Sequence, residues 1–411
     1  MTIKIRFLGG ADVVGRMAAL MDAGGRSIMV EYGMSPTKPP SYPLPAPKVD
    51  YAFLTHCHLD HSGMIPWLVS RYDNDVFTNP LTAEISEMLM YDSLKIAKAE
   101  GYPEPYNESD IERTMGNVIP MEFGDVIEVG ELEVHMHSGG HIPGAMMFEF
   151  IDDGRSTLYT GDIHTINTRL VAAAKPSKCD NLIIEGTYGG RLHPDRKKTE
   201  KEFLEKVKEV IERGGKVLIP CFAVGRTQEI MMLLNGTPYD KWLDGMGRSI
   251  SKVYMQYPEY LLNPNALRVA RRSFNEVKRP QMRSKARKGE IIVTTGGMLD
   301  GGPVLNYIKN VKDDPLSAIL ITGYQAEDTN GRMLLEKGSM NIDGNIEKIN
   351  CEVQRYDFSA HADHEQLIRF IHACDPENIM IMHSEHREPL FEDLSGDYNV
   401  ILPELERTYE L

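Results

Sequence analysis

The 411-residue sequence lacks the features of membrane-spanning and secreted proteins. It contains no apolar run long enough to cross a bilayer, and Met1 is not followed by the charged and apolar segments of a secretory signal. Cysteine is scarce, and no two cysteines form a C-x-x-C pair, which argues against both a disulfide framework and a thiolate zinc site. The five are Cys57, Cys179, Cys221, Cys351 and Cys374. We therefore expect a cytoplasmic protein with reduced thiols.

An excess of positive charge is also absent. The 60 acidic residues outnumber the 45 basic ones, and a net charge of −15 argues against general attraction to polyanions. Any surface for nucleic acid must therefore be local. The one candidate is a basic strip at 268–288, which contains Arg268, Arg271, Arg272, Lys278, Arg279, Arg283, Lys285, Arg287 and Lys288. It is either a solvated helix face or a strip that contacts phosphates.

Histidine and aspartate are concentrated at 55–61, in the order Thr-His-Cys-His-Leu-Asp-His. The apolar run 49–54 before this motif predicts a buried strand, and 62–72 after it predicts a helix. Because alternate side chains of an extended segment point the same way, His56 and His58 can bind one ion. Asp60 and His61 can then face a second. This donor set suits zinc without excluding manganese or iron, whereas the alternative is a polar loop that happens to be rich in histidine.

Further histidines and carboxylates follow other predicted strands. His141 lies among small residues after the strand 131–137, whereas His135 and His137 are alternatives that lie within that strand and lack flanking glycines. Asp162 follows Gly161, and His361 and His383 again come where strands end. Taken alone, each of these residues is more typical of a structural or turn position. Together they predict one composite site at the carboxyl ends of strands.

The length of the chain predicts two domains, or one domain with a large insertion. From about residue 187 to 340, strand and helix patterns alternate, which predicts parallel βαβ units and a second α/β domain. The segments before and after it, 1–186 and 341–411, would then form the first domain together. The sequence shows no internal repeat and no low-complexity tract.

These residues resemble the metallo-β-lactamase superfamily, and within it the β-CASP branch of nucleases. The motif at 56–61 matches the superfamily signature, and His141 and Asp162 match its later ligands. The β-CASP features match Glu185 in Glu-x-Thr-Tyr-Gly, His361 in Phe-Ser-Ala-His-Ala-Asp, His383 in His-x-Glu, and the stretches 222–229, 296–303, 323–326 and 331–332. The likeness covers essentially the whole chain. It is greatest to the nuclease subunit of the cleavage and polyadenylation specificity factor and to shorter archaeal relatives without KH-type segments.

Four positions depart from the family pattern without removing an expected ligand, and Glu31 is the clearest, since the family usually has Asp there. The other three are Met17, Gly296 and Ser384. The resemblance implies an αββα metallo-β-lactamase sandwich with an inserted parallel α/β β-CASP domain that covers the metal site and admits single strands. It implies two Zn²⁺ per chain, one bound by His56, His58 and His141, the other by Asp60, His61 and His383, with Asp162 and a water bridging them.

The same resemblance makes His361 the general acid that protonates the leaving ribose oxygen, with Glu185 holding its ring and Asp60 counted with the catalytic groups. Arg226 or Arg332 would contact flanking phosphates, and the alternative for each is a structural ion pair. The expected protein is a zinc-dependent ribonuclease acting on single-stranded RNA in 3′-end processing or decay, either within the chain or from the 5′ end. It would act as a homodimer or with other RNA-processing subunits. The alternatives are a non-catalytic RNA-binding scaffold subunit and a small-molecule metallo-hydrolase.

Overall fold

The computed structural model describes residues 3–411, which fold into two compact units. The first unit is built from residues up to 167, from 172–192 and from 360–411, and the second from 168–171 and 193–359. The main divisions between these units fall at 192/193 and 359/360, and the predicted domain boundaries are 186/187 and 340/341. Where the family domains begin and end within the chain stays a prediction.

The first unit contains two seven-stranded sheets. One has the order β22-β1-β2-β3-β4-β5-β6, with the bounds Thr408–Glu410, Lys4–Gly9, Ala18–Ala23, Arg26–Tyr32, Tyr51–Phe53, Asp75–Thr78 and Val118–Pro120. The other has the order β21-β20-β11-β10-β9-β8-β7, with the bounds Asn399–Ile401, Asn378–Met382, Asn181–Glu185, Arg155–Tyr159, Met146–Asp152, Leu132–Ser138 and Val126–Val129. The inner faces of both sheets share one apolar core, in which Phe53 packs against Phe148 and Phe150.

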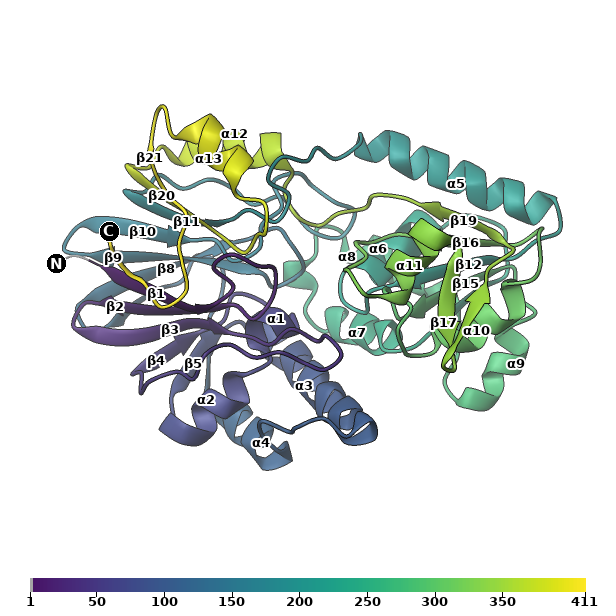
Figure 1. Ribbon diagram of the computed structural model, residues 1–411, viewed down its shortest axis with the longest axis horizontal. Coiled ribbons are helices and arrows are strands. Elements are labelled where there is room, and N and C mark those ends of the chain that lie inside the picture. The colour runs from purple at the N-terminus through teal and green to yellow at the C-terminus, as the bar shows by residue number, and fades with distance from the viewer. Residues whose placement is uncertain (1–2) are drawn as a thin grey trace. The chain divides into compact units, whose positions relative to one another are not determined.

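Helices cover the outer face of each sheet (Figure 1). On the first sheet lie α1 (Leu59–Ser62), α2 (Ile65–Tyr72), α3 (Pro80–Glu100) and α4 (Glu108–Gly116), which share an apolar cluster with strand residues such as Met29 and Val76. On the second sheet lie α12 (His364–Cys374) and α13 (Glu388–Leu394), which pack on residues such as Leu158 and Ile381. The predicted αββα sandwich is confirmed.

The second unit contains a six-stranded sheet in the order β14-β13-β15-β12-β16-β19, and every neighbouring pair in it is parallel. Its strands are Asn275–Glu276, Lys241–Asp244, Ile291–Thr295, Val217–Cys221, Ala318–Ile321 and Glu352–Arg355. Its helices are α5 (Arg196–Glu212), α6 (Arg226–Leu233), α7 (Gly247–Tyr254), α8 (Pro264–Arg272), α9 (Arg283–Ala286), α10 (Val304–Val311) and α11 (Asn330–Lys337), with the 3₁₀ turns Pro258–Tyr260 and Pro280–Met282 and the hairpin β17–β18 (Ser339–Ile342, Asn345–Lys348). The predicted parallel α/β architecture is confirmed.

Two elements differ from the sequence-based expectation. The helix expected over 62–72 is two helices, because α1 already begins at Leu59 and ends at Ser62, so that Asp60 and His61 lie in a helical turn. The strand expected at 351–358, which the predicted boundaries placed in the first domain, is β19 of the second unit. It pairs with β16 in the register Ala318↔Glu352. Strand pairing, not local pattern, decides which sheet receives it.

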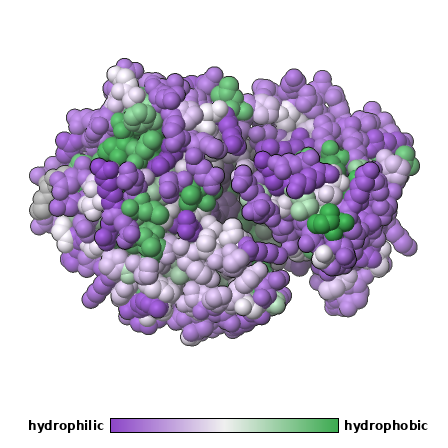
Figure 2. Space-filling view, in the orientation of Figure 1, coloured by the Kyte–Doolittle hydropathy of each residue, from purple (hydrophilic) through white to green (hydrophobic). Residues whose placement is uncertain are grey.

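The surface is mainly hydrophilic on the face drawn in Figure 2, where hydrophobic residues form small separate patches. In the described part of the chain, no helix combines the length and the apolar character that crossing a membrane would require.

Candidate metal centre

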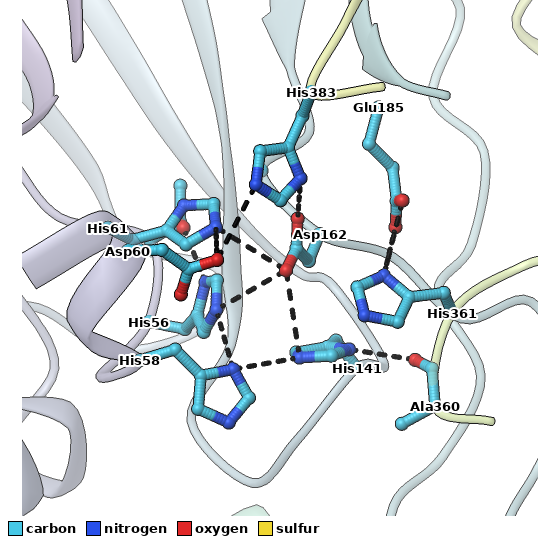
Figure 3. A network of polar contacts seen from close by, with 12 residues as sticks. His56, His58, Asp60, His61, His141, Asp162, Glu185, Ala360, His361 and His383 are labelled. Atoms are coloured by element: carbon cyan, nitrogen blue, oxygen red, sulfur yellow. Dashed lines mark hydrogen bonds and ion pairs between the residues drawn. The ribbon is translucent and has the colours of Figure 1, made fainter. Parts of the chain in front are cut away.

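Seven histidine and aspartate side chains meet in the first unit, and each comes from the end of a strand or from the short helix α1 (Figure 3). His56 and His58 follow β4, His141 follows β8, Asp162 follows β10, and His383 follows β20, while Asp60 and His61 lie in α1. Strands β10, β11 and β20 are parallel neighbours, so their carboxyl ends lie at one edge of the sheet. This edge brings together residues that are more than 300 positions apart in the chain.

The first donor set consists of His56, His58, His141 and Asp162. His58 Nδ1 lies 3.1 Å from His56 Nε2 and 3.2 Å from His141 Nε2. Asp162 Oδ2 lies 3.6 Å from His56 Nε2 and 3.8 Å from His141 Nε2. Ligands around a tetrahedral zinc ion with bonds of about 2.0–2.1 Å lie about 3.3 Å apart. The donor atoms are therefore spaced as a single small cation requires.

The second donor set consists of Asp60, His61 and His383. Asp60 Oδ2 lies 3.9 Å from His61 Nε2 and 3.5 Å from His383 Nε2. Asp162 also reaches this set, because its Oδ2 lies 3.4 Å from His61 Nε2 and its Oδ1 lies 3.2 Å from His383 Nδ1. The backbone N–H of Gly15 donates to His383 Nε2 at 3.0 Å and holds that ring in place. The carboxylate of Asp162 therefore lies next to histidines of both sets: Oδ2 approaches His56, His141 and His61, and Oδ1 approaches His383.

Two glycines allow the close approach of backbone on which this arrangement depends. Gly140 has φ +68°, and a Cβ there would lie 2.4 Å from the backbone of Ala174. Gly161 has φ +55°, and a Cβ there would lie 2.6 Å from Thr55 Oγ1. Both conformations disfavour residues with a side chain. They allow the turns that place His141 and Asp162 in the centre.

Hydrogen bonds to the outer nitrogen of several rings fix which nitrogen faces the cluster. The carbonyl oxygen of Ala360 can only accept, so His141 Nδ1 carries a proton and donates it at 2.8 Å, which leaves a lone pair on Nε2. His56 Nδ1 lies 3.0 Å from Thr55 Oγ1. Outer partners of this kind orient metal-binding histidines and set their tautomers.

Glu31 is a further functional residue, which the sequence revealed only as a departure from the family's Asp. Its side chain is fully buried, Oε2 lies 2.9 Å from His61 Nδ1, and Oε1 accepts a hydrogen bond from the Thr55 backbone N–H at 2.8 Å. The residue also adopts φ +64°. A buried carboxylate in this position orients His61 and anchors the start of the motif. A charged residue amid the apolar run of β3 was the signal available in the sequence.

Burial sets the charge of the first donor set. It lowers the pKa of His56, His58 and His141 below the usual value, so these imidazoles are neutral near pH 7. Burial acts in the opposite sense on Asp162, but nearby histidines, His61 above all, outweigh it and hold the pKa of that carboxyl well below its usual value. Three neutral imidazoles beside an ionised carboxylate are in the protonation state that a cation needs.

His361 and Glu185 lie beside the donor sets. His361 Nδ1 lies 3.0 Å and 3.2 Å from the two oxygens of Glu185, and Glu185 Oε1 also accepts from the Ile163 backbone N–H at 2.8 Å. The His361 ring lies 4.5 Å, centroid to centroid, from that of His141. Burial lowers the pKa of His361, but Glu185 and Asp162 outweigh this effect and raise it above the usual value. Because Glu185 engages Nδ1, a proton that His361 transfers is the one on Nε2.

Three family models match the chain: "Metallo-beta-lactamase superfamily" at residues 11–221, "Beta-Casp domain" at 227–334, and "Zn-dependent metallo-hydrolase RNA specificity domain" at 346–390. The first of them covers half of the chain. The chain belongs to the metallo-β-lactamase superfamily. It carries the β-CASP domain within it, and the predicted metal-dependent hydrolase is thereby confirmed.

Relatives from archaea agree with this assignment. The chain is 38% identical over 399 residues to "Probable RNase MJ4" of Methanocaldococcus jannaschii, with 93% of each chain covered. It is 33% identical to "RNase aCSPSF2" of Saccharolobus solfataricus, covering 93% of this chain and 79% of the relative. It is also 33% identical to "Transcription termination factor FttA" of Thermococcus kodakarensis, covering 96% and 68%. The resemblance to shorter archaeal relatives is confirmed.

A solved structure shares the metallo-β-lactamase fold. "Crystal Structure of a Protein of Unknown Function from Enterococcus faecalis" superposes with a TM-score of 0.64 and covers 100% of both chains. The two sequences are 16% identical, so this likeness shows the fold alone.

The other residues that the sequence nominated, as alternative ligands or as phosphate contacts, lie outside the two donor sets. His135 and His137 form a separate group with Glu149, and none of their atoms belongs to either donor set. Arg226 and Arg332 belong to the second unit. The Arg226 side chain is buried and its Nη1 donates to the Thr322 carbonyl, whereas Arg332 is exposed and contacts Glu336.

The basic strip 268–288 is divided between ion pairs and exposed charge. Arg271 pairs with Glu276 and Arg283 pairs with Asp244, each at 2.7 Å. Six other members of the strip are exposed: Arg268, Arg272, Lys278, Arg279, Lys285 and Lys288. Part of the strip therefore stabilises the second unit, and part is available to solvent or to a ligand.

Proposed function

We propose that this protein is a zinc-dependent ribonuclease that hydrolyses phosphodiester bonds in single-stranded RNA. The observation that carries the proposal is the carboxylate of Asp162, which reaches histidines of two donor sets, with His361 and Glu185 alongside. Two relatives, matched over 93% and 79% of their own length, are named as RNases. Together these observations favour phosphodiester hydrolysis over the two alternatives.

The donor sets fit two Zn²⁺ ions per chain. His56, His58 and His141 would hold one ion, Asp60, His61 and His383 the other, and Asp162 both. When bound, such a pair of cations lowers the pKa of water and stabilises negative charge on the phosphate. The side chain of Asp60 is 24% exposed, whereas that of Asp162 is 3% exposed. We therefore assign to Asp60 the additional task of orienting the water that attacks.

His361 is the general acid of the proposed reaction. Glu185 accepts from Nδ1 and keeps the ring in one orientation, while its charge favours the protonated imidazole. The Nε2 proton then passes to the ribose oxygen that leaves phosphorus. General acid catalysis of this kind contributes typically about 10²–10⁴-fold to the rate.

Contacts to the rest of the RNA are proposed for the second unit. Arg332, with a side chain 44% exposed, is the better candidate for a flanking phosphate, because the guanidinium of Arg226 is engaged inside the unit. The six exposed residues of the basic strip would add attraction to the phosphates, with the strong salt dependence that such contacts show.

The proposed setting is RNA 3′-end processing or decay in the cytoplasm, with either a second copy or other RNA-processing subunits as partner. The relatives named as RNases support RNA as the substrate. The C-terminal strands offer a surface through which a homodimer could form. β21 and β22 each form the edge of a sheet, while Val400, Leu402 and Leu411 pack on the apolar cores. An edge strand can pair with the same strand of another copy.

A three-way assay of the full chain tests the proposed function. Zinc is counted by emission spectroscopy, and cleavage is measured on end-labelled single-stranded RNA and, in parallel, on a thioester and a lactam. We expect at least the two zinc ions of these donor sets per chain, and RNA cleavage that a chelator abolishes and zinc restores. Hydrolysis of the thioester or lactam with intact RNA would establish the small-molecule hydrolase instead. RNA binding with neither zinc nor cleavage would establish the scaffold.

The mode of cleavage follows from the same RNA bearing either a 5′-phosphate or a 5′-hydroxyl. Equal rates and internal fragments indicate an endonuclease. Strong preference for the 5′-phosphate, with mononucleotide products, indicates 5′-to-3′ exonuclease activity.

A further inference from the structure

A second group of potential ligands lies on the outer face of the second sheet in the first unit. Along β8, Val134 and Met136 point into the core between the sheets, so His135 and His137 point to the opposite face. Glu149 on β9 is the register partner of His135, whereas Phe148 and Phe150 on either side of it belong to the core. Strand geometry alone thus places two imidazoles and one carboxylate together.

The contacts within this group are short. His137 Nε2 lies 2.7 Å from Glu149 Oε2, and the hydroxyl of Ser177 donates to the same oxygen at 3.3 Å. His135 Nε2 lies 2.5 Å from Glu133 Oε1, and its ring lies 6.4 Å from that of His137. One potential ligand atom from each of His135, His137 and Glu149 lies within 4.8 Å of the other two.

We propose that His135, His137 and Glu149 form a separate binding site for a divalent transition-metal ion of the zinc class. Two imidazole nitrogens and one carboxylate oxygen are ligands that zinc accepts, and three protein ligands leave a position for water. Ser177 orients Glu149, and Glu133 stands beside His135 as the outer carboxylate that fixes its tautomer. An ion here links β8, the strand that leads towards His141, to β9.

The competing explanation is an ion pair between His137 and Glu149 that needs no metal. His135 separates the two explanations, because its ring pairs with Glu133, whereas His137 pairs with Glu149, so that His135 is required only if an ion joins the three side chains. His135→Ala therefore leaves the ion pair intact and removes a ligand.

The test compares zinc bound by the full wild-type chain with zinc bound by His135→Ala, His137→Ala and Glu149→Gln after equilibrium dialysis at micromolar free zinc. We expect each variant to hold one zinc ion fewer than the wild type at this concentration, with at least a tenfold loss of affinity. RNA cleavage should not change. Only the difference matters, so the result does not depend on how many ions the catalytic centre holds.

His372→Ala is the matched control, because His372 is another surface histidine, paired with the Tyr398 hydroxyl at 2.8 Å. It should bind as much zinc as the wild type. Equal zinc content in the wild type and His135→Ala would overturn the proposal and leave the ion pair. An equal loss from His372→Ala would also overturn it, as evidence of non-specific binding to surface histidines. Thermal unfolding in chelator shows whether the variants remain folded.

Discussion

The first unit holds two groups of histidines and carboxylates that share chemistry but differ in surroundings. In the candidate metal centre, the side chains of His56, His61 and His141 are at most 3% exposed, and the outer nitrogen of each ring has a partner. In the β8–β9 group, the side chains of His135 and His137 are 29% and 32% exposed. Residue type therefore does not distinguish a reactive centre from a surface site.

The difference lies in where the backbone places the residues. The residues of the two central donor sets follow strand ends or lie in the short helix α1, where glycines allow tight turns and where neighbouring parallel strands bring distant segments together. The β8–β9 residues lie within strands, so only one pair of neighbouring strands can contribute ligands. Burial also lowers the pKa of His56 and His141 in the first donor set, so these imidazoles are neutral near pH 7, as ligands must be. The variants below test this comparison, from the largest expected effect to the smallest.

Asp162→Ala should have the largest effect, because this carboxylate contacts both donor sets. We expect loss of both central zinc ions and a fall in RNA cleavage of about 10⁴-fold or more, since the paired cations supply most of the electrostatic stabilisation. Metal counting and a cleavage assay measure the two effects. Glu149→Gln is the control and should leave cleavage unchanged. Full zinc in Asp162→Ala would show that the two sets bind their ions independently of this residue.

His361→Ala should lower cleavage by about 10²–10⁴-fold while both central zinc ions remain bound, because His361 transfers a proton and is not a ligand in this scheme. An RNA with a bridging sulfur in place of the leaving ribose oxygen needs no proton on departure. It should recover most of the lost rate. Glu185→Gln should show the same rescue with a smaller loss. A loss of metal from His361→Ala, or no rescue by sulfur, contradicts the assignment.

Glu31→Gln tests whether a buried partner of a ligand histidine accounts for the difference in metal binding between the central donor sets and the β8–β9 group. The amide still accepts from the Thr55 backbone N–H, but it no longer offers a carboxylate to His61. Loss of such an outer partner typically weakens metal binding by about 10–100-fold. We expect that decrease for the second central ion, measured by competition with a chelator. Glu31→Asp restores the family's residue and its charge, so it should bind zinc more tightly than Glu31→Gln.

The sequence was sufficient to predict the fold and to nominate every residue of the two central donor sets, because the motif at 56–61 and the family resemblance together point to them. It was not sufficient to predict the role of Glu31, whose partner His61 lies 30 positions further along and is reached only after folding. Nor could it place β19, since a strand of only four residues carries no mark of the sheet that it will join. Both features depend on contacts between segments that are distant in the sequence: the contact of Glu31 with His61, and the pairing of β19 with β16.

The second unit contains a histidine and a carboxylate, His193 and Asp357, that pair with each other and that we expect to bind no metal. His193 Nδ1 lies 3.2 Å from Asp357 Oδ2. Burial raises the pKa of Asp357, but the hydrogen bond and charge of His193 outweigh it and lower the pKa from 3.8 to about 2. A depressed pKa in the folded state adds stability above pH 4, which is lost as the pH falls from about 4 to about 2.

Asp357→Asn should therefore lower the free energy of unfolding at pH 7 by about 1–2 kcal/mol, after allowance for the 22% exposure of the side chain. The difference from the wild type should shrink as the pH falls below 4, because the carboxyl of the unfolded wild-type chain then becomes protonated before that of the folded protein. Thermal unfolding from pH 7 to pH 3, in chelator so that zinc release does not contribute, measures this. Added zinc should leave the difference at pH 7 unchanged. A zinc-dependent difference would mean that this pair, too, binds metal, and that exposure and pairing alone do not separate ion pairs from metal sites in this protein.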